Sequence, residues 1–303
     1  MKLTFSPVLT MIKTILFILN HPLNRHCRLR AIYIYFWWQF KCRFNGGKPI
    51  TFDWINGAKI LVHRSETGVT GNLYCGLHEF NDMAFLLHVL RPGDLFLDIG
   101  ANSGSYTVLA SGVCGSRTIA MEPIPDSFKR LTDNIKINNI SNLVNSICGG
   151  AGELPRRLMF TSDQDTVNHV VLDNIYPNSV SAQIHRLDDI VKNVKPILIK
   201  IDVEGFEYHV LKGAEDIINS ECPMAFLLEL NGSGKRYGIS DDMVSEILLN
   251  AKFEIYDYDP VHRKLQSRKT ARNSGNTLFI RNLTFFIDRI ENGKKFIVHK
   301  MTI

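Results

Sequence analysis

The hydrophobic positions between residues 79 and 280 follow two alternating patterns. Short apolar runs predict buried strands, and between them apolar residues recur every three or four positions, which predicts amphipathic helices. The predicted strands cover residues 95–99, 118–121, 143–148, 197–201, 225–230, 253–258 and 277–280. The predicted helices cover residues 79–90 and 106–111, begin at Pro125, and follow residues 201 and 230. Because strands alternate with helices, the pattern predicts an α/β fold with a doubly wound, mostly parallel, Rossmann-like sheet.

Two other stretches carry weaker strand patterns. Residues 158–161 and 167–172 resemble an inserted pair of strands. Residues 51–55 and 59–63 predict two short strands joined by a turn at Asn56-Gly57, because that dipeptide favours hairpin turns. A glycine-rich run follows and continues to Gly76, where we expect further turns.

The N-terminal pattern predicts two helices separated at His21-Pro22. Residues 8–19 are apolar but are interrupted by Lys13, and they are shorter than the ~20 residues of a spanning helix. No small-residue cleavage site follows, so we expect no signal peptide. Basic residues beside an aromatic cluster at 33–40 are typical of a helix in the headgroup region of a membrane. The alternative, that both helices pack on the catalytic domain, is compatible with the first and stays open.

Composition and charge narrow the class of protein. The chain has 303 residues, of which 45% are hydrophobic and 21% charged, which excludes disordered and coiled-coil proteins. Residues 1–52 contain eight Lys and Arg and no acid, whereas residues 53–260 carry 17 basic and 28 acidic residues. A general nucleic-acid binder spreads its positive charge over the fold, so we expect no nucleic-acid partner. The six cysteines form no C-x-x-C pair, which favours a reducing compartment and a cytoplasmic protein.

The most informative stretch follows the strand at 95–99. Asp98 is followed by Gly100, Ala101, Asn102 and Gly104, which form a tight turn into a helix whose N-terminus favours an anionic group. Glu122 lies 24 residues beyond Asp98 at the end of the next strand, where a carboxylate can accept both ribose hydroxyls. Asn102 stands where the dinucleotide fingerprint has its second glycine. These residues therefore predict a nucleoside site without a pyrophosphate, as for S-adenosylmethionine.

A second group of charged residues follows the strand at 197–201. Lys200 lies within the strand and Asp202 just after it on the same side, so the two can pair. Glu204 and Glu229 follow at the same sheet edge, where ligands of open α/β sheets bind. We expect these four residues to handle a proton or orient an acceptor, with Asp202 as the first candidate for the base. Two alternatives to this catalytic role remain: a purely structural ion pair between Lys200 and Asp202, and a Mg²⁺ site formed by Asp202, Glu229 and Asn231. We assign no metal ligand.

The ordered motifs resemble one known family. They are Asp98-Ile-Gly-Ala-Asn-x-Gly104, Glu122-Pro123, a helix with Asn134 and Asn138-Asn139, Leu187-Asp188-Asp189, and Lys200-Ile-Asp-Val-Glu-Gly-x-Glu207 with Leu211-Lys-Gly-Ala214. Together they look like the FkbM family of S-adenosylmethionine-dependent methyltransferases. The resemblance implies a seven-stranded class I methyltransferase sheet with a final antiparallel strand, O-methylation, and sugar, glycan or secondary-metabolite acceptors, as in polysaccharide biosynthesis. It implies cofactor contacts at Asp98, Gly100, Asn102, Gly104 and Glu122, and an acceptor near Asp202, Glu204 and Glu229.

Two positions depart from the family pattern. Cys148-Gly149-Gly150 stands where members often have an acid after the third strand, so we assign no acidic partner for the adenine. His185 replaces the usual Thr or Ser before Leu187.

We expect three parts along the chain. Residues 1–78 form a basic, aromatic N-terminal segment of helices and short strands, residues 79–260 the methyltransferase core, and residues 261–303 a basic extension that completes the sheet. Peripheral attachment to the inner face of an anionic membrane through residues 1–45 is an open expectation.

Three other functions share part of the pattern. An NAD(P)-dependent oxidoreductase or epimerase shares the strand, turn and acid but normally has the tighter glycine triplet. A nucleic-acid N-methyltransferase has an Asn/Asp-Pro-Pro-aromatic turn where this chain has Asp202-Val-Glu-Gly. A non-catalytic adaptor at the membrane would not require the intact set from Asp98 to Glu122.

Overall fold

A computed structural model describes residues 7–303 except 65, 172–175, 193 and 273–274. Within those residues the central sheet has eight strands, in the spatial order β13 (Lys264–Arg268), β12 (Glu254–Asp259), β14 (Asn276–Arg281), β11 (Met224–Glu229), β10 (Leu198–Ile201), β3 (Leu95–Ile99), β4 (Arg117–Glu122) and β5 (Val144–Cys148). The strands from β11 to β5 are parallel, and β14 runs antiparallel to both β11 and β12. This confirms the expected class I arrangement. The hairpin strand β13 is one more than the seven expected.

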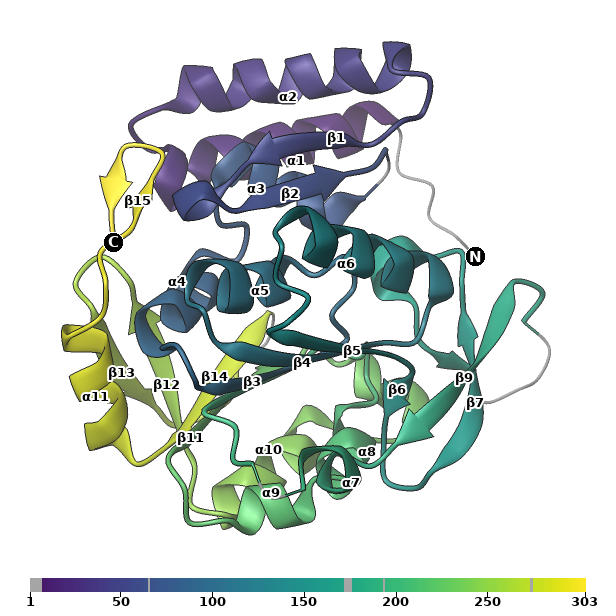
Figure 1. The fold of residues 1–303 in the computed structure, drawn as a ribbon, viewed down its shortest axis with the longest axis vertical. Helices are drawn as coiled ribbons and strands as arrows, with labels where there is room; N and C mark the ends of the chain where they lie inside the picture. Colours follow the sequence, from purple (N-terminus) through teal and green to yellow (C-terminus); the bar gives the residue numbers. More distant parts are fainter. Residues whose placement is uncertain (1–6, 65, 172–175, 193, 273–274) are drawn as a thin grey trace.

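Helices cover both faces of this sheet (Figure 1). One face carries α4 (Phe80–Val89), α5 (Ser105–Thr107) with a following π-helix (Val108–Val113), α6 (Pro125–Ile137) and α11 (Leu283–Glu291). The other carries α7 (Leu187–Val191), α8 (Glu207–Lys212), α9 (Glu215–Asn219) and α10 (Asp241–Asn250). The strands β3 and β10 are buried along their whole length, as their unbroken apolar runs predict for a sheet covered on both sides.

A second, smaller sheet lies beside the carboxyl end of β5. Its strands are β6 (Gly150–Ala151), β9 (Ser179–His185), β7 (Arg156–Thr161) and β8 (Val170–Val171), in that order. The inserted strand pair is therefore present, but it is shorter than predicted at β8, since Asp165–Val167 forms a 3-10 helix and residue 172 lies outside the described residues. The strand β9, which joins the pair to β6, was not predicted.

An N-terminal layer covers the α6 side of the sheet (Figure 1). It consists of α1 (Pro7–Asn20), α2 (Arg28–Phe44), the hairpin β1 (Ile50–Asp53) and β2 (Lys59–Val62), and α3 (Thr67–Cys75). The two expected helices are present and pack inward through a cluster that includes Ile18, Tyr35 and Trp38. Within the described residues, no helix is both long and apolar enough to cross a membrane. A short C-terminal hairpin, β15 (Ile297–Val298) and β16 (Met301–Thr302), completes the chain.

The prediction of turns for the glycine-rich run up to Gly76 was wrong, because most of that run forms α3. Glycine disfavours helices, so the glycines of this run gave no helical signal. At Gly71, close packing explains why the residue is glycine. A Cβ atom on Gly71 would lie 2.1 Å from Nδ1 of His78. Glycine at this position therefore allows α3 to lie close to the segment that leads into α4.

Candidate active site

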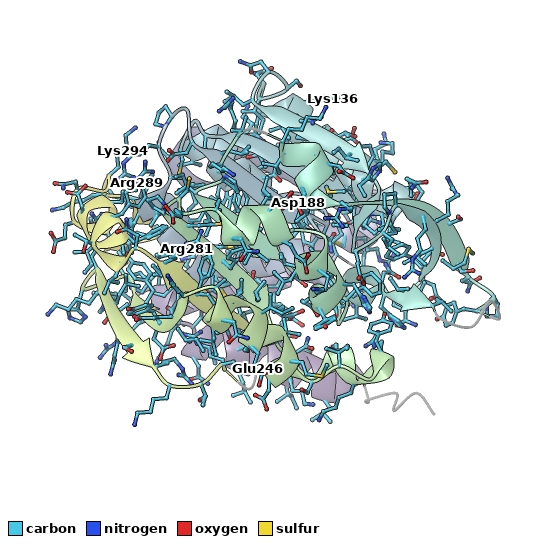
Figure 2. The ribbon with its side chains drawn as sticks, turned by 90° about the horizontal axis from the view of Figure 1, so that it is seen from below. Lys136, Asp188, Glu246, Arg281, Arg289 and Lys294 are labelled. Atoms are coloured by element: carbon cyan, nitrogen blue, oxygen red, sulfur yellow. The ribbon has the colours of Figure 1, made fainter. Side chains whose placement is uncertain are left out.

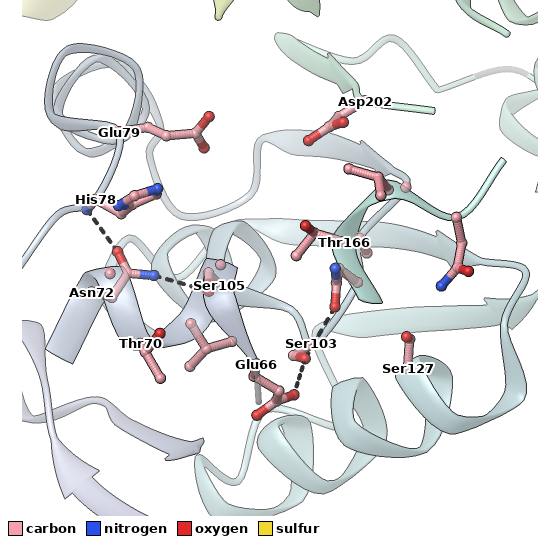
Figure 3. A pocket seen from close by; sticks show the side chains of 18 of the residues that line it. Glu66, Thr70, Asn72, His78, Glu79, Ser103, Ser105, Ser127, Thr166 and Asp202 are labelled. Atoms are coloured by element: carbon pink, nitrogen blue, oxygen red, sulfur yellow. Dashed lines mark hydrogen bonds between the residues drawn. The ribbon is translucent and has the colours of Figure 1, made fainter. Parts of the chain in front are cut away.

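One large cavity lies at the carboxyl ends of the central strands. Its volume is about 1370 Å³, and its wall includes residues of β3, β4, β10 and β11 together with residues of α1, α2 and α3. Figure 3 shows Glu79 and Asp202 pointing into this space from different elements. The sheet edge is the one where open α/β folds bind ligands. All ten predicted site residues except Gly104 line the cavity.

The turn after β3 is held against the neighbouring strand by its backbone. The amides of Gly100 and Ala101 both donate to the carbonyl oxygen of Met121, at 3.0 and 2.9 Å. Gly100 has a φ of +81°, and a Cβ atom there would lie 1.8 Å from the carbonyl oxygen of Asp202. Glycine is therefore required at position 100 by both conformation and space. The close approach also brings the end of β3 against the end of β10.

Glu122 is fixed in place by two backbone amides. Its Oε2 accepts from the amide of Asn102 at 2.9 Å, and its Oε1 accepts from the amide of Ile124 at 3.0 Å. Each carboxylate oxygen keeps a second lone pair for another donor. Burial raises the pKa of this carboxyl to about 7, because removal from water disfavours the charged form. The side chain is thus oriented before any ligand arrives.

Asp98 is fully buried and only half satisfied. Its Oδ2 accepts a hydrogen bond from the hydroxyl of Thr107 at 2.6 Å, whereas its Oδ1 has no hydrogen-bond partner among the described residues. Burial raises the pKa of Asp98, although the nearby Lys200 opposes the shift. A buried acceptor without a partner is costly, so this oxygen is suited to a donor from a bound ligand.

Lys200 and Asp202 form the ion pair that their spacing predicts. Lys200 Nζ lies 2.7 Å from Asp202 Oδ2, and the lysine is only 3% exposed. The ammonium group also lies 4.9 Å from the ring centroid of Tyr106, within the range of a cation–π contact. Burial tends to raise the pKa of Asp202, but the charge of Lys200 and its hydrogen bond outweigh burial and lower it. Asp202 is therefore ionised at neutral pH.

Three carboxyl groups meet at this end of the cavity, and we call Asp202, Glu204 and Glu229 the carboxylate cluster. One oxygen of each lies within 4.8 Å of the others. Burial and the charge of Asp202 raise the pKa of Glu204 to about 7 and that of Glu229 to about 9. The three members therefore differ in protonation at neutral pH, since Asp202 is ionised, Glu229 is protonated and Glu204 titrates.

Asn231 has the ordinary capping use that the sequence left open as an alternative to Mg²⁺ binding. Its Oδ1 accepts from the amide of Ser233 at 2.9 Å. Lys200 already places a positive charge beside the carboxylate cluster.

Two side chains of the N-terminal layer, which were not predicted from the sequence, clamp the turn after β3. Ser103 donates through its hydroxyl to Oε1 of Glu66 at 2.6 Å, and Arg130 lies 3.3 Å from the same oxygen. The other oxygen of Glu66 accepts from the amide of His63 at 2.6 Å. Asn72 adds a second link, because its side-chain amide donates to the hydroxyl of Ser105 at 3.1 Å (Figure 3). These contacts were not predicted because the run that contains α3 was interpreted as turns.

A further acidic pair was also missed. The side-chain amide of Asn276, at the start of β14, donates to Glu79 at 3.0 Å and to Asp82 at 3.1 Å. Burial, and then the charge of Glu79, raise the pKa of Asp82 to about 7. These residues come from segments almost 200 positions apart, so no local signal joins them.

Several motif residues have structural rather than chemical contacts. Asn134 accepts from the amide of Leu61 at 2.8 Å, and Asn138 exchanges two hydrogen bonds of 2.7 Å with the backbone of Lys59, so both attach α6 to β2. Asp188, labelled in Figure 2, accepts from the amides that begin α9 at 3.2 and 3.1 Å. His185 lies against Gly149, where a Cβ atom would be 3.2 Å from its ring.

Residues 98–259 match the model of the family described as the Methyltransferase FkbM domain. The chain belongs to this family. The FkbM segment contains the turn after β3, Glu122 and the whole carboxylate cluster, but Glu66, Glu79 and Asn276 lie outside it.

Individual FkbM-like relatives match over part of their length. The hexuronic acid methyltransferase AglP of Haloferax volcanii is 29% identical over 140 residues, which cover 45% of this chain and 56% of that protein. The 31-O-demethyl-FK506 methyltransferase FkbM of Streptomyces tacrolimicus is 27% identical over 172 residues, covering 45% of this chain and 66% of that protein. The match thus spans less than two thirds of either relative. A solved structure of a putative transferase from Pyrococcus horikoshii has a TM-score of 0.44 and 12% identity, covering 78% of this chain and 71% of that chain.

Proposed function

We propose that this protein transfers a methyl group from S-adenosylmethionine to a hydroxyl group of a sugar, glycan or secondary metabolite. The observation that carries the proposal is the meeting, in one cavity of an FkbM family fold, of the Glu122 and Asp98 carboxylates with the carboxylate cluster. The first pair suits a nucleoside with an amino acid attached. The second suits a hydroxyl group that must lose its proton.

The chain's donor set fits S-adenosylmethionine at the β3–β4 end. Glu122 has one lone pair left on each oxygen, which suits the two hydroxyls of a ribose. The orphan Oδ1 of Asp98 suits a cationic amino group, which would also offset the penalty of burying that carboxylate. When bound, S-adenosylmethionine supplies a methyl group carried on a positively charged sulfur. We infer that Glu122 and Asp98 bind and orient it.

The carboxylate cluster supports a division of roles at the other end. Asp202 is held ionised by Lys200, so it is a strong hydrogen-bond acceptor but a weak base. We propose that Asp202 orients the acceptor hydroxyl and that Glu204, with its pKa of about 7, takes the proton. Glu204 also has a φ of +54°, an uncommon conformation for a residue other than glycine that is found often at functional sites. Glu229 stays protonated and hydrogen-bonds to Asp202.

The acceptor class rests on size and on the relatives. A cavity of about 1370 Å³ is larger than most sites for a single drug-sized ligand, which are roughly 300–1,000 Å³. It therefore has room for a second molecule beside the cofactor. The two relatives are named for methylation of a hexuronic acid and of 31-O-demethyl-FK506. A hydroxyl-bearing sugar or metabolite is the acceptor class that agrees with both names and with the carboxylate cluster.

Calorimetry with S-adenosylmethionine and with NAD⁺ tests the proposal directly. We expect S-adenosylmethionine to bind and NAD⁺ not to bind, since Asn102 occupies the position at which a pyrophosphate needs glycine. Transfer of a labelled methyl group to a panel of sugars, uronic acids and hydroxylated metabolites then identifies the acceptor. Binding of NAD⁺ in place of S-adenosylmethionine would overturn the proposal, and binding without transfer to any hydroxyl would favour the adaptor alternative.

A further inference from the structure

Helix α2 has an apolar face that no other described part of the chain covers. It is the outermost helix of the N-terminal layer (Figure 1). Five large apolar residues, each three or four positions from the next, form its exposed stripe, with exposed fractions of 88% for Leu29, 68% for Tyr33, 54% for Phe36, 62% for Phe40 and 73% for Phe44. At 3.6 residues per turn this spacing places all five on one side of the helix. We call these five residues the α2 stripe.

The opposite side of α2 already anchors the helix to the protein. Ala31, Tyr35 and Trp38 are buried in a cluster with Ile60 and Val62 of β2. The helix is therefore anchored by the side opposite the α2 stripe. Within the stripe, the ring of Phe36 contacts the buried ring of Tyr35 edge-on, with 5.3 Å between centroids. Apolar patches of this kind on a surface commonly mark an interaction site.

The charge beside the stripe identifies the partner. Residues 7–48 contain seven Lys and Arg and no acid, and the basic residues that flank the stripe on α2, Arg30, Lys41 and Arg43, are exposed. A protein partner or a second copy of the chain would have to bury these charges against acids. An anionic lipid surface receives the aromatic side chains between its head groups and the basic side chains at its phosphates.

The cavity reaches the same helix. Phe36 belongs both to the α2 stripe and to the cavity wall, and Tyr35 and Trp38 line the cavity beside it. The far end of the cavity holds the carboxylate cluster. Where the wall meets α2 it carries these three aromatic rings together with Gln39, Cys42 and Arg43, and where it meets the sheet it is acidic. This arrangement suits an amphiphile with its polar group inside and its apolar part toward α2.

We propose that the α2 stripe docks on an anionic lipid membrane and that the cavity receives the polar head of an acceptor anchored in that membrane. The second clause rests on the proposed methyl transfer. The first clause does not, because docking requires only the surface of α2. On this view the N-terminal layer selects acceptors by where they are located as well as by their chemistry.

Flotation of the full chain with phosphatidylcholine vesicles, with and without phosphatidylglycerol, tests the docking. We expect binding only to the anionic vesicles, and a decrease in binding as salt screens the charges. Replacing Arg30→Ala and Lys41→Ala together should weaken binding by roughly 30-fold, since each basic residue near an anionic surface contributes about 5-fold. Replacing Tyr33→Ser and Phe40→Ser together should weaken it at least 10-fold.

The matched control is the pair Leu154→Ser and Val261→Ser, which removes exposed apolar residues outside the N-terminal layer. It should bind vesicles like the unmodified protein. Failure of the unmodified protein to float with anionic vesicles, or equal binding by all variants, would overturn the inference. A dimer in lipid-free solution that the Tyr33→Ser and Phe40→Ser pair converts to monomers would assign the stripe to a second copy instead.

The acceptor clause needs a separate measurement. With labelled S-adenosylmethionine and membranes of the organism that carries the gene, the label should appear in the fraction extracted by chloroform and methanol. Label only in the aqueous fraction would overturn the lipid-anchored acceptor while leaving the proposed function intact. Vesicle binding without any S-adenosylmethionine binding would overturn the proposed function while leaving the docking intact.

Discussion

The two ends of the cavity hold carboxylates in opposite ways. At the β3–β4 end, Glu122 is fixed by two backbone amides and Asp98 by a hydroxyl. At the β10–β11 end, Asp202, Glu204 and Glu229 face one another, and Lys200 pairs directly with Asp202. Backbone donors orient a carboxylate and favour its ionised form, whereas crowded carboxylates raise one another's pKa values. This difference agrees with the proposal that the first end binds the cofactor and the second exchanges a proton.

The largest effect should follow from removing the proposed base. We expect Glu204→Gln to lower turnover by about 10²–10⁴, the usual contribution of a general base, with unchanged affinity for S-adenosylmethionine. Because the base must be deprotonated, kcat of the unmodified enzyme at saturating cofactor should be low below pH 7 and rise to a plateau above it. The pH profile of kcat for Glu204→Gln should lose this rise.

Glu246→Gln is the control, since this exposed glutamate lies on α10. Its kcat should match that of the unmodified enzyme at every pH. If Glu204→Gln retains turnover while Asp202→Asn loses it, with cofactor affinity kept in both, then Asp202 is the base. The proton would then pass to the carboxylate that Lys200 holds ionised, and not to Glu204.

Gly100→Ala should damage both ends together, because the new Cβ atom would lie 1.8 Å from the carbonyl oxygen of Asp202. We expect a loss of roughly 2–4 kcal/mol in the free energy of unfolding, from the clash and the strained φ. Gly57→Ala is the matched control, since its φ is +84° but nothing lies within 4 Å of its Cβ position. Urea unfolding of the two variants separates clash from strain, and equal losses would contradict the close approach.

Glu122→Gln should affect binding alone. It leaves an amide nitrogen against the backbone donors that the carboxylate satisfies, and we expect a loss of roughly 1–3 kcal/mol in cofactor affinity. The dissociation constant from calorimetry should rise, while kcat at saturating cofactor changes little. A large decrease in kcat with unchanged affinity would mean that the two ends do not divide binding from proton transfer.

The smallest effect should come from the attachment of α6 to the N-terminal layer. Asn138→Ala removes the two hydrogen bonds to Lys59 and a third to the carbonyl oxygen of Asn134. At about 0.5–1.5 kcal/mol per bond the total loss in unfolding free energy is roughly 1.5–4.5 kcal/mol, and we expect the low end because the two bonds to Lys59 are exposed. Turnover and cofactor affinity should stay within twofold. Lys136→Ala, on the exposed side of the same helix, should change none of these.

The sequence predicts the β3–β4 end of the cavity better than the β10–β11 end, for a physical reason. The turn from Asp98 to Gly104 is local, and its hydrogen bonds involve backbone atoms whose positions the strand and the helix fix. The protonation of Glu204 and Glu229 depends on how close three carboxylates from two strands come, which spacing along the chain does not state. The contact of Glu66 with Ser103 joins residues 37 positions apart. Glu66 also lies at the start of α3, which the sequence did not predict as a helix.

The same limit applies to the rest of the fold. The strands β3, β4, β10 and β11 were found because buried parallel strands are continuous apolar runs. The hairpin strand β13 is half exposed and polar, so its pattern is weak. The partnership of Asn276 with Glu79 required the three-dimensional placement of β14 beside the start of α4.

The attachment of β2 to α6 also sets an order of events during synthesis. Lys59 leaves the ribosome 79 residues before its partner Asn138, an interval of about 4–16 s at typical elongation rates of 5–20 residues per second. The cluster that buries Tyr35 and Trp38 is drawn from residues before position 76, so the inward face of α2 has its packing partners early in that interval. The N-terminal layer can therefore pack on itself before α6 is made, and α6 then attaches to a hairpin that is already in place.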